Sequence, residues 1–200
     1  MTCWVVIPVK APGACKTRLA GVLGDAARRD LVATMLDHVV EIASRVTGID
    51  EVLLVGPSRH DLPATTRLLD DPGYGLNAAL ASAARTAAGE GVDRLLFVSA
   101  DLPHLTSGDL QALIAQPAGG AAIAPDRAGT GTNALSLPGR RAMEFGLRYG
   151  IGSFAAHVAE ADRIGLDLAV IRSRTLALDI DVPGDLKALR TGPDRDRYAA

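Results

Sequence analysis

The chain has 200 residues, of which 48% are hydrophobic and 22% are charged, a composition typical of a single globular domain. Its 21 Lys and Arg nearly balance 23 Asp and Glu, so the net charge of −2 argues against nucleic acid or a membrane surface as a partner. Two cysteines and four scattered histidines exclude a disulfide framework and a His/Cys zinc cluster.

The N-terminal sequence Met-Thr-Cys-Trp-Val-Val-Ile-Pro lacks a basic start followed by a long apolar run, so we expect no signal peptide. No apolar run approaches the roughly 20 residues that would span a bilayer. We therefore expect a soluble cytoplasmic protein, with one domain at 1–190 and a frayed tail at 191–200.

Short apolar runs bounded by Gly and Pro alternate with longer segments that have apolar side chains every third or fourth position. The first pattern predicts buried strands and the second predicts helices. In chain order we predict a strand at 4–8, a helix at 25–46, strands at 51–56 and 66–69, a helix at 76–88, a strand at 94–99, a helix from Thr106 to 116, strands at 121–125 and 134–137, a helix at 153–160, strands at 168–171 and 176–178, and a helix at 183–190.

This alternation predicts an α/β sandwich with a mostly parallel central sheet. The later strands follow one another without long helices, so a mixed arrangement is open for the second half. Ligands of such sheets bind at the carboxyl ends of the strands, near a switch in strand order. Three polar loops are expected at that edge: 10–18, 101–103 and 126–133.

The first polar loop carries Lys10, Lys16 and Arg18 directly after the first strand. A phosphate-binding P-loop would need glycine at positions 10 and 15, which hold Lys10 and Cys15 instead. A flexible cationic loop can still wrap a triphosphate with ammonium groups and backbone amides. A solvated surface loop is the alternative.

Three aspartates are candidate metal ligands. Asp101 follows a buried strand directly, although it could instead cap the turn before Pro103. Asp179 and Asp181 lie on one side of an extended chain, but Asp181 is also a natural cap for the helix near Pro183. Mg²⁺ prefers one or two carboxylates together with phosphate oxygens and water. We therefore expect Mg²⁺ at Asp101, with Asp179 favoured over Asp181 as its second ligand.

Three Gly-containing segments could approach a ligand closely. The segment 129–133 superficially matches a dinucleotide pattern, but a strand follows it, so a phosphate-binding turn or a plain hairpin is the better interpretation. Gly75 permits close approach of the backbone and Asn77 could contact a base edge, unless both belong to a simple loop before a helix. Ser153 could open an anion-binding helix or simply cap it.

Seven of these segments occur in a fixed order along nearly the full chain: Ile7-Pro-Val-Lys10, Lys16-Thr-Arg18-Leu19, Gly73-Tyr-Gly75-Leu76-Asn77, Ser99-Ala-Asp101-Leu-Pro103, Gly129-Thr-Gly131-Thr-Asn133, Gly150-Ile-Gly152-Ser153-Phe154 and Asp179-Ile-Asp181. Together they resemble the 2-phospho-L-lactate guanylyltransferase family, whose close branches use phosphoenolpyruvate or 3-phospho-D-glycerate.

The resemblance implies a Rossmann-like α/β/α sandwich of the nucleotidyltransferase type, as in molybdenum-cofactor guanylyltransferase. It also implies a step of coenzyme F-420 biosynthesis, in which GTP and a phosphorylated three-carbon acid give a guanosine-diphospho acid and pyrophosphate. By the same resemblance, Thr132, Gly150 and Ser153 match contacts to the acceptor acid, and Asp101 and an aspartate of the 179/181 pair match metal ligands.

The expected roles are therefore catalysis by Lys16, Arg18 and Asp101, nucleotide binding by Lys10, Lys16, Gly75 and Asn77, acceptor binding by Thr132, Gly150 and Ser153, and Mg²⁺ binding by Asp101, Asp179 and Asp181. A cytidylyl or sugar-nucleotide transferase on the same scaffold, or a non-catalytic nucleotide-binding regulator, are the alternatives. The acid, the groups that contact guanine and the oligomeric state, with a homodimer as one option, stay open.

Overall fold

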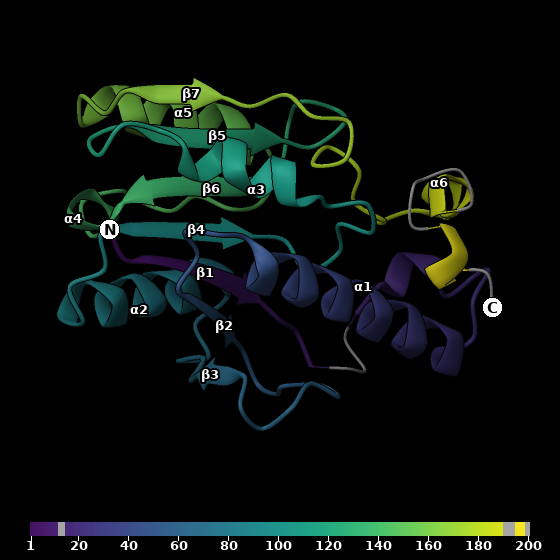
Figure 1. The fold of residues 1–200 in the computed structure, drawn as a ribbon. Helices are drawn as coiled ribbons and strands as arrows, with labels where there is room; N and C mark the ends of the chain where they lie inside the picture. Colours follow the sequence, from purple (N-terminus) through teal and green to yellow (C-terminus); the bar gives the residue numbers. More distant parts are fainter. Residues whose placement is uncertain (12–14, 190–194, 199–200) are drawn as a thin grey trace.

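The centre of the molecule is a seven-stranded sheet in the order β3-β2-β1-β4-β6-β5-β7 (Figure 1). The computed structural model describes residues 1–11, 15–189 and 195–198. The strand β6 pairs antiparallel with both its neighbours, and all other pairings are parallel, which confirms a mostly parallel sheet with a mixed second half. The strands are β1 (Cys3–Pro8), β2 (Glu51–Val55), β3 (Arg67–Leu69), β4 (Arg94–Val98), β5 (Ala121–Pro125), β6 (Thr132–Pro138) and β7 (Leu168–Val170).

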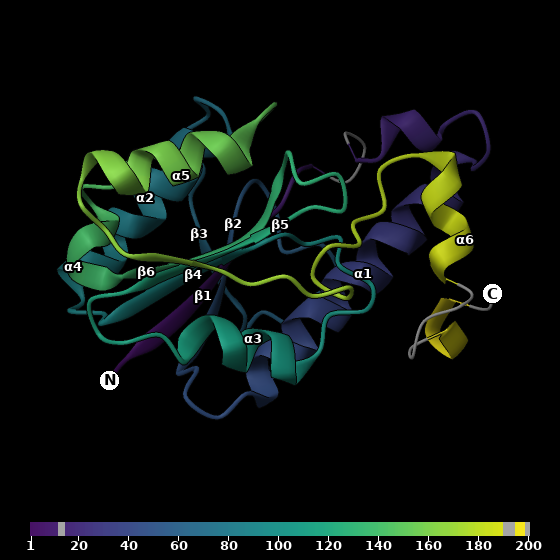
Figure 2. The same ribbon diagram turned by 90° about the horizontal axis from the view of Figure 1, so that it is seen from above.

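Helices cover both faces of the sheet and make a three-layer sandwich (Figure 2). Along β1, Val6 packs toward the layer of α2, α4 and α5, whereas its neighbours Val5 and Ile7 pack toward α1 and α3. This alternation follows from the two-residue period of a strand. The helices are α1 (Asp25–Arg45), α2 (Leu76–Gly89), α3 (Ser107–Ile114), α4 (Gly139–Ala142), α5 (Ser153–Arg163) and α6 (Leu186–Leu189), with 3-10 turns η2 (Thr17–Leu19), η3 (Pro183–Asp185) and η4 (Arg195–Tyr198).

The prediction of a strand at 176–178 is wrong, because the chain makes a turn there. The Ser173 carbonyl accepts a hydrogen bond from the amide of Ala177, and the Ser173 hydroxyl accepts one from the amide of Thr175. Leu176 is fully buried in this turn. The apolar run therefore reflects one anchored leucine rather than a sheet partner.

The N-terminus lies at the opposite end of the molecule from α6 (Figure 1). Residues 12–14 of the cationic loop, and residues 190–194 and 199–200 near the C-terminus, lie outside the described residues. Within the expected frayed tail, residues 195–198 form the turn η4, where Arg197 donates a hydrogen bond to the Glu41 carboxylate on α1. Among the described residues, no helix has the combination of length and hydropathy that a membrane span requires.

Candidate active site

A cleft of about 680 Å³ opens where β1, β2 and β4 end. The cationic loop, the loop after β4 and the segment before η3 line it, so segments from both ends of the chain face each other across it. This is the edge at which parallel sheets bind ligands. The predicted residues that line the cleft are Lys10, Lys16, Arg18, Gly75, Asp101, Asp179 and Asp181. A smaller hollow of about 370 Å³, between Arg127 and the 172–178 segment, contains none of the predicted residues.

Three carboxylates converge in this cleft. Asp101, Asp179 and Asp181 each offer an oxygen, and these atoms all lie within 4.8 Å of one another. Burial raises the pKa of the Asp179 carboxyl, and the nearby Asp101 carboxylate raises it further. The excess of negative charge and the all-oxygen donor set fit a hard divalent cation such as Mg²⁺. Both aspartates of the 179/181 pair thus lie at the site.

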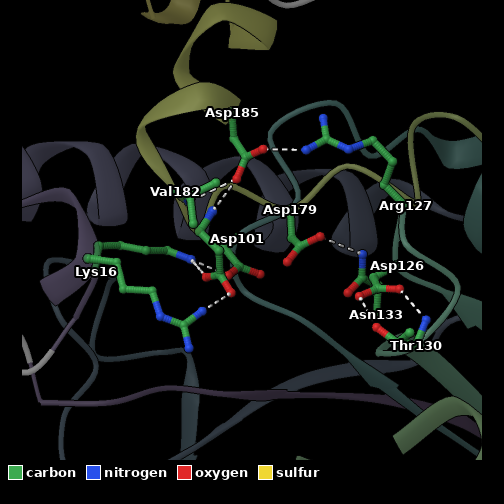
Figure 3. Close-up of polar contacts among 11 residues, drawn as sticks. Lys16, Asp101, Asp126, Arg127, Thr130, Asn133, Asp179, Val182 and Asp185 are labelled. Carbon is green, nitrogen blue, oxygen red and sulfur yellow. Dashed lines mark hydrogen bonds and ion pairs between the residues drawn. The ribbon is translucent and has the colours of Figure 1, made fainter. Parts of the chain in front are cut away.

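Lys16 places its ammonium group among these carboxylates (Figure 3). Its Nζ contacts the Asp101 carboxylate directly and lies 2.9 Å from Asp181 Oδ1. Burial opposes the ammonium charge, but Asp101 and Asp181 outweigh that effect and raise the pKa of Lys16. Lys16 is therefore a fixed cation that compensates the charge of the carboxylates. To contact a triphosphate, its ammonium group would have to keep these contacts while binding the phosphate as well, or give them up.

The backbone of Lys16 adopts a left-handed conformation, with φ 51° and ψ 40°. This region is disfavoured for residues other than glycine, so the surrounding contacts must hold it. Arg18 lies at the rim, with its side chain 73% exposed and Nη1 3.8 Å from Asp181 Oδ2. Lys10 is also exposed, and its carbonyl oxygen contacts Nε2 of His60. Lys10 and Arg18 are thus exposed, whereas only 9% of the Lys16 side chain is exposed.

Asp185 holds the segment that carries Asp179 and Asp181 (Figure 3). Its Oδ2 accepts hydrogen bonds from the amides of Asp181 and Val182, at 3.0 and 2.8 Å, and its Oδ1 accepts one from Arg127. Burial favours the neutral acid, but these two amides and Arg127 prevail and lower the pKa of Asp185. The N-cap residue of η3 is therefore Val182 and not Asp181, and Asp185, three residues later, supplies the capping carboxylate. The Asp181 side chain is left to contact Lys16.

Asn133 fixes the other side of the carboxylate cluster. Its Nδ2 donates to the carbonyl of Leu176 at 2.9 Å and to Asp179 Oδ1 at 3.3 Å. Sequence reasoning missed Asn133 and Asp185 as positioning residues. A signal existed for Asp185, because an acidic residue three positions after a helix start is typical of a capping box. No local pattern pointed to Asn133, because its partners are more than 40 residues away.

Thr132, Gly150 and Ser153, the residues predicted to contact the acceptor, are not among those that line this cleft. Thr132 begins β6, and Gly150 and Ser153 lie at the start of α5. Thr132 is 6% exposed, and its Oγ1 lies 3.0 Å from Nδ1 of His157, one helical turn after Ser153. Ser153 is the first residue of α5 after Gly152, so it does not cap the helix. Its amide donates to the carbonyl of Gly150 at 3.2 Å. Thr132 thus contacts α5 through His157, and Gly150 is hydrogen-bonded to Ser153 at the start of the same helix.

Asn77 joins this region to the cleft. Its Nδ2 donates to the carbonyl of Tyr149 at 3.0 Å, and its Oδ1 accepts from the amide of Tyr149 at 2.8 Å. A contact between Asn77 and a base would require this pair of bonds to open. The hydrogen bonds instead hold the 148–152 loop against the start of α2, next to Gly75 at the cleft wall.

The Gly/Thr segment after β5 is a hairpin turn. The amides of Gly129 and Thr130 donate to the carbonyl and carboxylate of Asp126, so these donors are already satisfied. The strand β6 follows the turn and pairs antiparallel with β5, which excludes the dinucleotide interpretation. The plain hairpin alternative therefore describes this segment.

The sequence matches a family model described as guanylyl transferase, CofC-like, over residues 3–196. It is 42% identical to the phosphoenolpyruvate guanylyltransferase of Sphaerobacter thermophilus, over 94% of this chain and 93% of that protein. It is 39% identical to the enzyme of the same name from Rubrobacter xylanophilus, over 94% of each chain. It is 38% identical to the 2-phospho-L-lactate guanylyltransferase of Methanothrix thermoacetophila, over 90% of this chain and 80% of that protein.

Solved structures with lower identity share the fold. A protein of Desulfovibrio desulfuricans G20, described as a nucleotide-diphospho-sugar transferase, superposes with a TM-score of 0.78 at 18% identity, covering 98% of this chain and 94% of that chain. CMP:2-keto-3-deoxy-manno-octonic acid synthetase in complex with CTP gives a TM-score of 0.66 at 12% identity, covering 96% and 98%. The predicted nucleotidyltransferase-type α/β sandwich is thereby confirmed.

Proposed function

Because the chain belongs to the CofC-like guanylyl transferase family, we propose that it transfers GMP from GTP to phosphoenolpyruvate and releases pyrophosphate. The relatives with 42% and 39% identity carry the name phosphoenolpyruvate guanylyltransferase, which favours this acid over 2-phospho-L-lactate and 3-phospho-D-glycerate. The reaction would be a step in the synthesis of coenzyme F-420, as the family resemblance implies, and we expect it to take place in the cytoplasm.

The observation that carries this proposal is the meeting of three carboxylates beneath a cationic loop in one cleft. Asp101, Asp179 and Asp181 would hold Mg²⁺, with Lys16 as its neighbour. When bound there, Mg²⁺ would neutralise charge on the phosphates and lower the repulsion between two anionic substrates. Asp185 and Asn133 keep the carboxylates in place.

The acceptor phosphate supplies the nucleophile. A phosphate monoester loses its second proton with a pKa of about 6, so it is largely a dianion at neutral pH. One of its oxygens forms a bond to the α-phosphorus of GTP, and the bond from that phosphorus to the bridging oxygen of the β-phosphate breaks. The electron pair leaves with pyrophosphate. No side chain has to remove a proton from the nucleophile.

The side chains around the cleft would bind and orient the two substrates. Lys10, Lys16 and Arg18 would hold the triphosphate and stabilise the departing pyrophosphate, and loss of one such group costs on the order of 10²–10³ in rate. Gly75 would let the nucleotide approach the backbone of the cleft wall. Thr132, Gly150 and Ser153 would place the acid in line with the α-phosphorus, and Asn77 would support their loop.

Pyrophosphate release with each of GTP, ATP, CTP and UTP, in the presence of each of the three acids, tests the activity. We expect release with GTP and phosphoenolpyruvate to exceed every other pair. A preference for CTP, or for a sugar phosphate as acceptor, would favour another nucleotidyltransferase. GTP binding without pyrophosphate release in any mixture would favour a non-catalytic regulator.

A further inference from the structure

His157 on α5 is a fully buried histidine whose two ring nitrogens both have partners. Its Nε2 lies 2.9 Å from the backbone amide nitrogen of Arg148, and its Nδ1 lies 3.0 Å from Thr132 Oγ1. The ring also packs edge-on against Tyr149, with 4.8 Å between ring centroids. The imidazole therefore connects the start of β6 to the 148–152 loop.

These partners determine which nitrogen carries the hydrogen. A backbone amide can only donate, so Nε2 must accept from Arg148 with its lone pair. A neutral imidazole has one N–H, which therefore lies on Nδ1 and donates to Thr132 Oγ1. An imidazolium would point a second N–H at the amide of Arg148. Burial opposes that charge and lowers the pKa of His157 to about 4.

The direction of this bond decides what the Thr132 hydroxyl can do. Because Oγ1 accepts from His157, its own hydrogen is not used in that bond and can be donated elsewhere. With the opposite tautomer, the hydroxyl would donate to Nδ1 and would have no hydrogen left for a ligand. Carboxylates and phosphate dianions only accept hydrogen bonds, so a site for an anionic acid needs Thr132 as a donor.

We propose that His157 is a positioning residue that fixes Thr132 as a hydrogen-bond donor toward the anionic acceptor acid. This inference rests on the proposed function, in which Thr132 contacts that acid. The amide of Arg148 sets the tautomer, and the next residue, Tyr149, is held by both polar atoms of Asn77. The same chain of contacts therefore orients Thr132 and the loop that carries Gly150.

Two substitutions of His157 test its two hydrogen bonds, to Thr132 and to the amide of Arg148, one at a time. In His157→Asn, the amide nitrogen can take the place of Nδ1 and keep the donor toward Thr132. In His157→Gln, the amide oxygen can take the place of Nε2 and keep the acceptor for Arg148, but the donor toward Thr132 is lost. We expect His157→Gln to raise the KM for phosphoenolpyruvate by about tenfold with an unchanged KM for GTP, and His157→Asn, which keeps the donor toward Thr132, to raise it by less.

A double-mutant cycle shows whether His157 acts through Thr132. Thr132→Val removes the hydroxyl at similar volume, and we expect Thr132→Val/His157→Gln to have the same KM for the acid as Thr132→Val alone. Phe145→Leu is the matched control, because Phe145 packs against the same ring without a hydrogen bond to it. Thermal unfolding of each variant checks that it folds.

The outcomes distinguish this inference from the proposed function. If wild type forms no guanosine-diphospho product with any acid, the proposed function is overturned. If product forms but His157→Gln leaves the KM for the acid unchanged, or Phe145→Leu raises it equally, the role of His157 is overturned. Nitrogen-15 NMR of the wild-type imidazole is expected to show hydrogen on Nδ1 at neutral pH, and hydrogen on Nε2 would overturn the role without any assay.

Discussion

At the scale of single residues, Asp101 has the largest expected effect on turnover. Its carboxylate belongs to the cluster of three and contacts the buried ammonium of Lys16. Asp101→Asn keeps the shape of the side chain but removes its charge, so we expect a folded protein with kcat lowered at least 10²–10³-fold. Asp162→Asn, an exposed change on α5, is the matched control. Near wild-type activity of Asp101→Asn at saturating Mg²⁺ would contradict the role.

Lys16 is expected to act on the nucleotide rather than on the acid. Lys16→Ala removes the cation between Asp101 and Asp181, which leaves these carboxylates without their compensating charge. We expect a higher KM for GTP and a lower kcat, with little change in the KM for phosphoenolpyruvate. Steady-state kinetics with each substrate varied in turn measure this, and a rise confined to the KM for the acid would contradict it.

His157 is expected to make stability depend on pH. Its pKa in the folded protein is about 4, whereas the ordinary value is 6.5, so the unfolded chain binds the proton more readily between these values. This contribution to stability is complete above pH 6.5 and falls as the pH drops toward 4. In urea unfolding at pH 7 and pH 5, His157→Gln should lose less stability than wild type. An equal loss in both proteins would contradict the assignment.

At the scale of elements, the turn η3 and the loop after β5 form a clamp on the segment that carries Asp179 and Asp181. Arg127 reaches from that loop to Asp185, whose carboxylate also accepts from the amides of Asp181 and Val182. Substitution of a residue that supports a metal ligand typically lowers the metal affinity 10–100-fold. We therefore expect Arg127→Ala to raise the Mg²⁺ concentration for half-maximal activity by about tenfold.

The neighbouring Arg172 offers a matched control for this clamp. It is exposed and lines the same small hollow as Arg127. Arg172→Ala should leave the Mg²⁺ requirement at the wild-type value, which a Mg²⁺ titration of activity measures for both variants. An equal rise of the half-maximal Mg²⁺ concentration in both variants would contradict the role of the clamp. The loss of a positive charge near the site would then explain the higher Mg²⁺ requirement.

Local patterns predicted most elements, and contacts between distant segments explain the errors. Short apolar runs identified β1, β2, β4 and β5 to within a residue or two. The run at 176–178 has the same apolar character, but a single side chain, Leu176, accounts for it by filling the core from a turn. To form a strand, this segment would have needed a free edge of the sheet beside it. The local sequence does not indicate whether such an edge is present.

At the scale of the whole molecule, the candidate site is an assembly of both ends of the chain. Lys16 comes from the N-terminal loop, Asp101 from the middle, and Asp179 and Asp181 from the C-terminal part. Placement after a strand pointed to Lys16 and Asp101, whereas Asp179 and Asp181 were predicted from their position on one side of an extended chain and from the family resemblance. Asn133 and His157 could not be recognised in the same way, because their roles depend on partners such as Asp179 and Thr132 that only the fold brings near.

Competition between the acids tests the central claim most directly. Purified protein, GTP and Mg²⁺ are incubated with equal amounts of phosphoenolpyruvate, 2-phospho-L-lactate and 3-phospho-D-glycerate, and the products are identified by mass spectrometry. The account predicts mainly the guanosine-diphospho derivative of phosphoenolpyruvate, and its loss when a chelator replaces Mg²⁺. Absence of any guanylylated acid, or equal formation with and without the chelator, would contradict it.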